Sequence, residues 1–152
     1  MYIIFQKKGG GAFGALIRWW TKSKYCHCEL QFSNGTRATS SPGIGVIQHG
    51  RIQPEYASYW ESVYLPEVTP QDEETIRAFF DGEKDCGYDW KGLLFSHVFT
   101  IGWESKKRWF CSEICATALE KVGIIRYGKY KRGAGFSPEA LYRALPIVTI
   151  PE

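Results

Sequence analysis

Cys111 is the residue of this sequence best placed for nucleophilic chemistry. It lies in the expected first turn of a helix, directly after Phe110. Backbone N–H groups without helical partners meet the positive end of the helix dipole there, and both favour a thiolate over a thiol. The same N–H groups are suited to holding an oxyanion. The alternative is a small buried cysteine that only packs the helix, and Cys115, one turn later, fits that description.

His27 is a candidate base for this thiol. It lies where an expected strand begins, and a histidine on a strand edge that faces a cysteine at a helix N-terminus forms a Cys–His nucleophile pair. A surface or packed histidine is the alternative. The other two histidines compete for the role. We expect His49 in a solvated turn beside Gly50, and His97 packed on an apolar helix.

Structural zinc is a second interpretation of these side chains. Ligand types suited to zinc occur at Cys26, His27, Cys28, Cys111 and Cys115. Neighbours on a strand point to opposite faces, however, so Cys26 and Cys28 would point away from His27. Cys111 and Cys115 have the spacing of one helical turn, not that of a CxxC knuckle. We therefore expect no metal and no cofactor.

The elements that must position these residues follow from periodicity and turn signals. Short strands are expected at 2–6, 28–33, 36–41, 44–48 and 60–65, with Asn34-Gly35 as a hairpin turn. Helices are expected at 12–21, 69–80, from about 90, at 110–122 and at 137–145, and a closing strand at 147–150. Thr69 and Pro70 mark a helix start, and Gly123 a helix end. A strand-rich first half and a helix-rich second half indicate an α+β fold.

Composition narrows the classes of protein. The 152 residues fit one domain, and 44% hydrophobic with 23% charged residues excludes a disordered tail or a coiled coil. The net charge of +3 is too small to indicate nucleic acid binding. We see no signal peptide or membrane span, and the odd number of cysteines, five, suits a reducing compartment. We therefore expect a cytoplasmic or phage-delivered protein.

The tryptophans are expected to pack in the core. Core packing is favoured over a substrate groove for Trp19, Trp20 and Trp60, because large aromatic residues are usually buried.

Three segments together resemble the NlpC-type cysteine peptidases in circularly permuted order. The histidine strand comes first, as Cys-His-Cys-Glu-Leu-Gln-Phe-Ser-Asn-Gly at 26–35. Gly-Tyr-Asp-Trp-Lys-Gly at 87–92 and Phe-Cys-Ser-Glu at 110–113 follow. This order is similar to that of the permuted papain-like group, which includes YaeF/YiiX-like amidases and lecithin retinol acyltransferase relatives. Small phage and prophage members look most similar, through Ile-Arg-Trp-Trp-Thr at 17–21 and Ser-Ser-Pro at 40–42.

The resemblance covers roughly residues 2–122 and implies a fold and a set of roles. The fold would be a single permuted papain-like domain over residues 1–152, with a small antiparallel sheet packed against helices. Cys111 would be the nucleophile and His27 its base. Counting through the hairpin places the third residue, which orients the imidazole, at Thr39. Ser41 and Glu29 lie on the same face of the strands and are alternatives.

The resemblance also implies an oxyanion site and a reaction. Tyr88 matches the family tyrosine whose hydroxyl helps the backbone N–H groups at Cys111 and Ser112 to hold the oxyanion. The expected reaction is cleavage of an amide bond through an acyl-enzyme, in a peptide or amide substrate such as a peptidoglycan fragment. The alternatives are a non-catalytic phage-derived binding module on the same scaffold and a lipid acyl hydrolase or transferase. We rank lipid chemistry lower because lipid-handling relatives usually need a membrane-anchoring segment, which this sequence does not offer.

Overall fold

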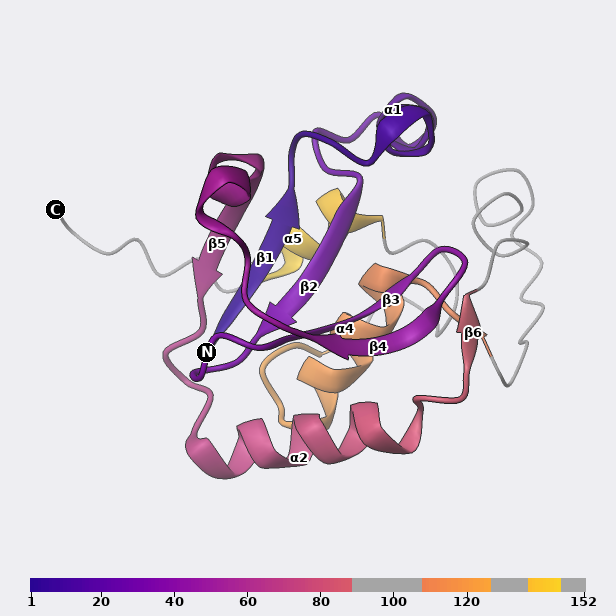
Figure 1. The fold of residues 1–152 in the computed structure, drawn as a ribbon. Helices are drawn as coiled ribbons and strands as arrows, with labels where there is room; N and C mark the ends of the chain where they lie inside the picture. The colour runs from indigo at the N-terminus through magenta and orange to yellow at the C-terminus, as the bar shows by residue number, and fades with distance from the viewer. Residues whose placement is uncertain (89–107, 127–136, 146–152) are drawn as a thin grey trace, which may run out of the picture.

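A five-stranded antiparallel sheet forms the centre of the fold (Figure 1). The computed structural model describes residues 1–88, 108–126 and 137–145. The sheet order is β4-β3-β2-β1-β5. Its strands are β1 (Tyr2–Gln6), β2 (His27–Gln31), β3 (Arg37–Ser41), β4 (Gly45–His49) and β5 (Trp60–Tyr64).

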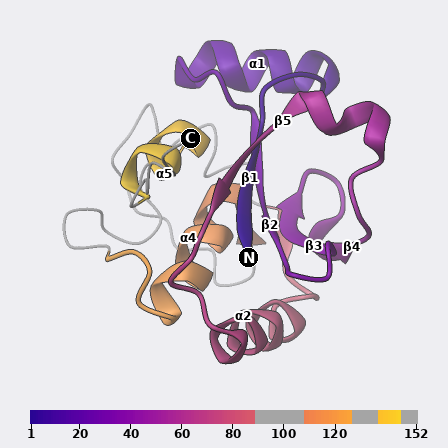
Figure 2. The same ribbon diagram turned by 90° about the vertical axis from the view of Figure 1, so that its left-hand side faces the viewer.

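Helices cover one face and two ends of this sheet. They are α1 (Gly11–Thr21), α2 (Pro70–Gly82), α4 (Cys111–Lys121) and α5 (Pro138–Ala144), together with the 3-10 helix η1 (Pro54–Tyr59). Helix α4 packs against β2 and β3, and both α2 and α5 contact α4. Figures 1 and 2 show α1 at one end of the sheet and α2 at the other. A short parallel pair, β6 (Gly87–Tyr88) and β7 (Arg108–Trp109), leads into α4.

The pairing of β1 with β2 decides which side chains face α4. Ile3 lies opposite Leu30 and Phe5 opposite Cys28, and all four side chains are fully buried in the core against α4. Because side chains alternate along a strand, His27 and Glu29 project from the opposite face of β2. The strand therefore offers an apolar face to the helices and a polar face that carries His27 and Glu29.

The structure confirms an α+β fold with a small antiparallel sheet, and most local predictions hold. The cap of α2 is a reciprocal pair: the Asp72 N–H donates to the Thr69 hydroxyl at 3.2 Å and the Thr69 N–H to the Asp72 carboxylate at 3.0 Å. Gly35 turns the hairpin with φ +84°. Gly123, with φ +77°, follows α4. Sequence patterns did not predict η1, which has no buried residue and hence no apolar pattern.

Some predictions need correction or cannot be compared. Trp19 is not a core residue, because 72% of it is exposed, whereas Trp60 is half-buried. The side chain of Trp20, the helix near residue 90, His97 and the strand at 147–150 lie outside the described part. In that part, no helix is long and apolar enough to cross a membrane.

Candidate active site

Cys111 is the first residue of α4 and is only 4% exposed. Two side-chain contacts fix the chain just before it. The Ser40 hydroxyl donates to the Trp109 carbonyl at 2.8 Å, which ties the start of α4 to β3. The Trp109 indole N–H donates to Glu83 at 2.8 Å, which ties it to the end of α2. The nucleophile candidate thus begins a helix whose start is anchored on both sides.

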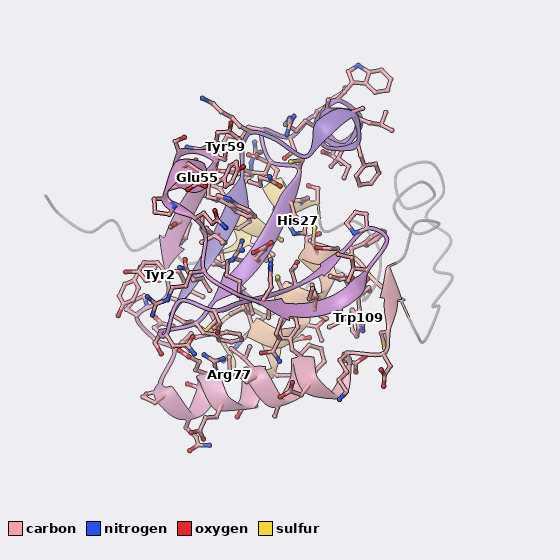
Figure 3. The ribbon with its side chains drawn as sticks, viewed as in Figure 1. Tyr2, His27, Glu55, Tyr59, Arg77 and Trp109 are labelled. Atoms are coloured by element: carbon pink, nitrogen blue, oxygen red, sulfur yellow. The ribbon has the colours of Figure 1, made fainter. Side chains whose placement is uncertain are left out.

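His27 is the first residue of β2, at the end of the strand nearest to α1 (Figure 3). Its side chain is 14% exposed. The ring Nε2 lies 3.2 Å from Glu29 Oε1 and 3.5 Å from Thr39 Oγ1. Since Nε2 is directed at these oxygens, Nδ1 is the ring nitrogen left for a partner on the other side of the ring.

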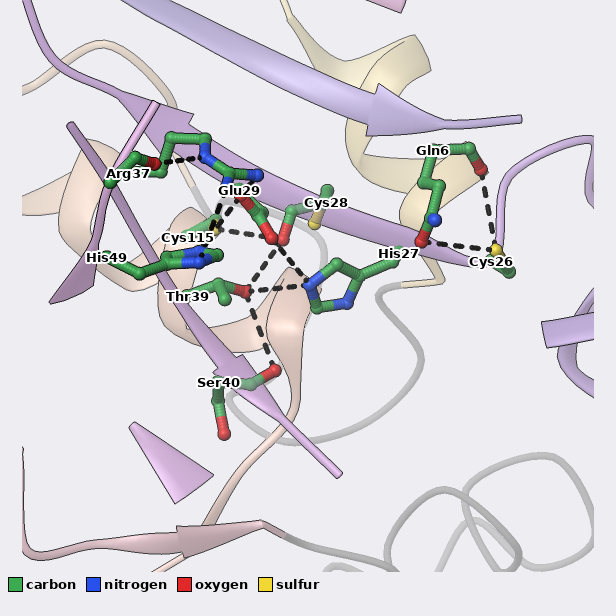
Figure 4. A network of polar contacts seen from close by, with 11 residues as sticks. Gln6, Cys26, His27, Cys28, Glu29, Arg37, Thr39, Ser40, His49 and Cys115 are labelled. Atoms are coloured by element: carbon green, nitrogen blue, oxygen red, sulfur yellow. Dashed lines mark hydrogen bonds and ion pairs between the residues drawn. The ribbon is translucent and has the colours of Figure 1, made fainter. Parts of the chain in front are cut away.

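Glu29 is the centre of a buried network of charged groups (Figure 4). Its side chain is 4% exposed. Oε2 accepts a hydrogen bond from the Arg37 guanidinium at 2.9 Å and lies 3.2 Å from His49 Nε2, a contact of ion-pair length without hydrogen-bond alignment. Burial alone would raise the pKa of Glu29, but the His27 and His49 rings lower it to about 2. Glu29 is therefore an anion that faces His27.

Cys111 and His27 shift each other's protonation in opposite directions. A hydrogen bond from the Cys28 thiol is the largest effect on Cys111 and, together with the charge of His27, holds the pKa of Cys111 well below its usual range despite burial. Burial would lower the pKa of His27, but the charge and hydrogen bond of Cys111, then Glu29, raise it well above its usual value. A low-pKa thiol beside a high-pKa imidazole favours the thiolate–imidazolium pair.

Cys28 supports Cys111 from the apolar face of β2. Burial and its cysteine neighbours raise the pKa of Cys28 well above its usual value, so it stays a thiol and can donate. Its backbone N–H also lowers the pKa of Cys111. The Cys115 thiol, one turn further along α4, points at the Cys28 carbonyl at 3.9 Å. Alternation places Cys28 away from His27, as expected, and toward the helix.

The remaining candidate residues differ in their contacts with His27 and Cys111. Thr39 is fully buried, and its hydroxyl donates to the Cys28 carbonyl at 2.8 Å, so its contact with His27 is the weaker one. Within the described residues, Ser41 makes no polar contact with His27. Ser112 is buried beside Cys111. The backbone of Tyr88 lies in β6, but its side chain is not among those described.

Two residues of the network were not predicted from the sequence. His49 is not a solvated turn residue: it ends β4, pairs with Arg37 of β3 and is directed at Glu29. Arg37 holds Glu29 and also lies 3.4 Å from His49 Nδ1. The two residues are opposite each other in the β3–β4 register, and local sequence patterns do not reveal that register.

The described residues include no group of three His, Cys, Asp or Glu side chains arranged to hold a metal ion. Glu29 does face two histidines, but the Arg37 guanidinium already contacts both Glu29 and His49.

Comparison with known proteins gives a distant match. No family model matches the chain. The chain is similar to a probable lipoprotein peptidase. That protein is YaeF of Escherichia coli (strain K12), with 24% identity over 146 residues, covering 76% of this chain and 52% of YaeF. The chain therefore spans about half the length of this curated relative, and the match fits a peptidase-like protein.

Proposed function

We propose that this protein is a cysteine peptidase or amidase on a circularly permuted papain-like scaffold, with Cys111 as nucleophile and His27 as its base. The observation that carries the proposal is the arrangement of three side chains: Cys111 begins α4, His27 begins β2, and Glu29 Oε1 lies 3.2 Å from His27 Nε2. The Cys28 thiol and His27 lower the pKa of Cys111, and Cys111 raises the pKa of His27, which supports the same assignment. A buried cysteine that only packs a helix would have a raised pKa, as Cys28 does. The similarity to a probable lipoprotein peptidase supports the same class of reaction.

In the acylation step, the Cys111 thiolate attacks the carbonyl carbon of an amide. A C–S bond forms, and the carbonyl electron pair moves to the oxygen. We assign the oxyanion to the first backbone N–H groups of α4, at Cys111 and Ser112, because N–H groups at a helix start point toward the positive end of the helix dipole. The His27 imidazolium then protonates the leaving nitrogen, the C–N bond breaks and the amine departs.

In the deacylation step, neutral His27 takes a proton from water, and the hydroxide attacks the thioester. The C–S bond then breaks, the product leaves as a carboxylic acid that releases its proton to solvent, and the thiolate–imidazolium pair is restored. Glu29 is the positioning residue of both steps, because it binds Nε2, fixes the ring and stabilises its positive charge. We place it ahead of Thr39, whose one hydroxyl proton is directed at the Cys28 carbonyl.

The proposed substrate is an amide of a peptide, with a peptidoglycan fragment as the first candidate. Two other functions use the same scaffold. A binding module would not need a depressed pKa at Cys111, so the Cys28 and His27 contacts favour the enzyme. A lipid acyl hydrolase would use the same Cys–His pair on an ester, and only products can separate it from an amidase.

Two matched cysteines on one helix test the nucleophile. Cys111→Ala should abolish labelling by a thiol-directed acylating probe, whereas Cys115→Ala, one turn away, should retain it. Peptide mass spectrometry identifies the labelled residue, and circular dichroism checks that both variants fold. Equal labelling of the Cys111→Ala variant would contradict the proposal.

The contribution of Cys28 is tested by two substitutions that differ in one group. Cys28→Ser keeps a donor toward Cys111, whereas Cys28→Ala removes it. Alanine should therefore raise the pKa of Cys111 and slow its alkylation at about pH 6 by about tenfold, with serine close to wild type. Equal rates in the two variants would show that Cys28 does not hold the thiolate.

Products identify the substrate class. The wild type is incubated separately with muropeptides and with phospholipid vesicles, and mass spectrometry follows the products. We expect new amines from muropeptides that the Cys111→Ala variant does not release. Release of fatty acid alone would assign the lipid reaction, and no product from either would favour the binding module.

A further inference from the structure

Helix α1 exposes a row of apolar residues to solvent. Ala12, Ala15, Leu16 and Trp19 are spaced by three or four residues and all four are exposed, Leu16 at 49% and Trp19 at 72%. The protein-facing side is formed by Gly14 and Ile17. A surface helix ordinarily turns its polar residues outward, so this stripe has an inverted pattern. Such an inversion marks an interaction surface.

Basic residues flank both ends of this helix. The first acidic residue of the chain is Glu29, whereas Lys7, Lys8, Arg18, Lys22 and Lys24 all precede it. Lys7 and Lys24 approach Glu61 at 3.9 and 3.3 Å, and Arg18 turns inward to the Cys26 sulfur at 2.9 Å. Lys8 and Lys22 are exposed, and neither has an ion-pair partner among the described residues. Positive charge is thus available at each end of the apolar stripe.

The position of α1 suits a flat partner. Figure 2 shows the helix lying along one end of the molecule, with its axis across the strands. A plane placed against this end would meet the helix along its length, which is about 16 Å for 11 residues. The stripe spans two to three turns and offers on the order of a few hundred Å², less than the roughly 800 Å² per partner of a stable protein interface.

We propose that the exposed face of α1, formed by Ala12, Ala15, Leu16 and Trp19, docks on an anionic phospholipid bilayer. Trp and Leu would enter the headgroup–acyl boundary, and Lys8 and Lys22 would contact the anionic headgroups. The helix would lie in the plane of the interface. Because residues 22–26 join α1 directly to β2, the end of the sheet that carries His27 would face the membrane. This surface does not depend on the proposed catalytic function.

Vesicle sedimentation tests the surface directly. The whole protein is mixed with vesicles of phosphatidylcholine alone or of an equimolar mixture with phosphatidylglycerol. The wild type should sediment with the anionic vesicles and remain in solution with the neutral ones, and added salt should weaken the binding. Failure to sediment with anionic vesicles, or equal binding to both kinds, would overturn the proposal.

Matched variants locate the binding face. The double change Leu16→Ala and Trp19→Ala should lower the partition coefficient by at least about tenfold, because it removes most of the apolar area. Ile44→Ala is the control, since Ile44 is 68% exposed but lies outside α1. The double change Lys8→Gln and Lys22→Gln should reduce binding to the anionic vesicles. Unchanged binding of the Leu16/Trp19 variant would overturn the proposal.

Two further measurements distinguish membrane docking from catalysis and from self-association. The Cys111→Ala variant should bind vesicles as the wild type does, so loss of catalysis and loss of docking are independent results. Size-exclusion chromatography should give one monomer peak for both the wild type and the Leu16/Trp19 variant. If the wild type eluted as a dimer and the Leu16/Trp19 variant as a monomer, the face would bind a second copy of the chain, and the membrane proposal would be overturned.

Discussion

Glu29 and Glu73 are two buried carboxylates with different surroundings. They are 3% and 9% exposed, and the pKa of each is lowered although burial opposes ionisation. Glu73, on α2, accepts hydrogen bonds from the Ser33 N–H and hydroxyl at 3.0–3.1 Å and from Arg77 at 3.0 Å. Glu29 contacts Arg37 and two histidines. The two carboxylates are thus similarly buried, but only Glu29 has imidazole rings among its partners.

The difference separates a structural carboxylate from one that can act in chemistry. Glu73 ties the β2–β3 hairpin to α2, and none of its partners changes charge near neutral pH. Glu29 is directed at a histidine, which gains and loses a proton in the range where enzymes work. We therefore expect Glu29 to influence reactivity and Glu73 only stability.

Of changes at the two carboxylates, the isosteric change at Glu29 should cause the greater loss of activity. Glu29→Gln should reduce amide hydrolysis by about 100-fold, because the His27 imidazolium loses its anion. Glu73→Gln should leave the rate within about twofold. Steady-state kinetics on the substrate found with muropeptides measures both, and the rate of Cys111 alkylation provides a second measure. Equal losses in the two variants would remove the distinction between the two carboxylates.

Truncation of Glu73 should lower stability without lowering reactivity. Glu73→Ala leaves the Ser33 N–H and the Arg77 guanidinium without their acceptor, and we expect a loss of about 2 kcal/mol in the free energy of unfolding. Urea denaturation measures this loss. Cys111 alkylation in the folded variant should be unchanged, and a slower rate would indicate that the hairpin also positions the site.

The two networks should respond differently to alkaline pH. The pKa of His27 is raised, so its contribution to stability is present below its ordinary pKa of about 6.5 and is lost as pH rises through its value in the folded protein. Between about pH 6 and pH 9, the wild type and Glu73→Gln should therefore lose more stability than Glu29→Gln, in which Cys111 alone raises the pKa of His27. Urea denaturation at both pH values measures this difference. An equal change in the free energy of unfolding for all three proteins would contradict the prediction.

In acid, the two carboxylates should behave alike. The pKa of Glu29 falls from its ordinary 4.5 to about 2, which corresponds to roughly 3 kcal/mol. That contribution is present above about pH 4.5 and is lost as pH falls toward 2. Glu73 follows the same direction.

A change at Thr39 should affect the rate least. Its hydroxyl is 3.5 Å from His27 but 2.8 Å from the Cys28 carbonyl. Thr39→Val should lower the rate by about threefold, far less than Glu29→Gln. The same kinetic assay compares the two. A loss at Thr39 equal to that at Glu29 would make Thr39 the orienting residue.

Helices and turns were predictable where a short stretch of sequence carries their signal. The spacing in α1 and the cap at Thr69 indicated their helices, and Asn34-Gly35 indicated the hairpin. Residue type misplaced Trp19, because a large aromatic side chain is usually buried and its type does not show which way its helix face points. An apolar stripe is assigned to the core by default, and only tertiary structure reverses it.

The site was predictable only in part. Cys111 and His27 were selected as candidates by residue type, helix position and resemblance, and their catalytic roles stay predictions. Glu29 shares a strand face with its alternatives, so spacing could not rank it. Arg37 and His49 reach it through the β3–β4 register, and Cys28 reaches Cys111 through packing of α4 on β2. These are long-range contacts, which local sequence patterns do not encode.

The proposed mechanism depends on Cys111 being held as a thiolate by His27 and Cys28. The rate of Cys111 alkylation by iodoacetamide against pH, followed on the Cys111 peptide by mass spectrometry, tests this most directly. We expect rapid alkylation that persists below about pH 6, and loss of that acid reactivity in His27→Ala. An ordinary thiol profile, rising only near about pH 8.5 and unchanged in His27→Ala, would contradict it.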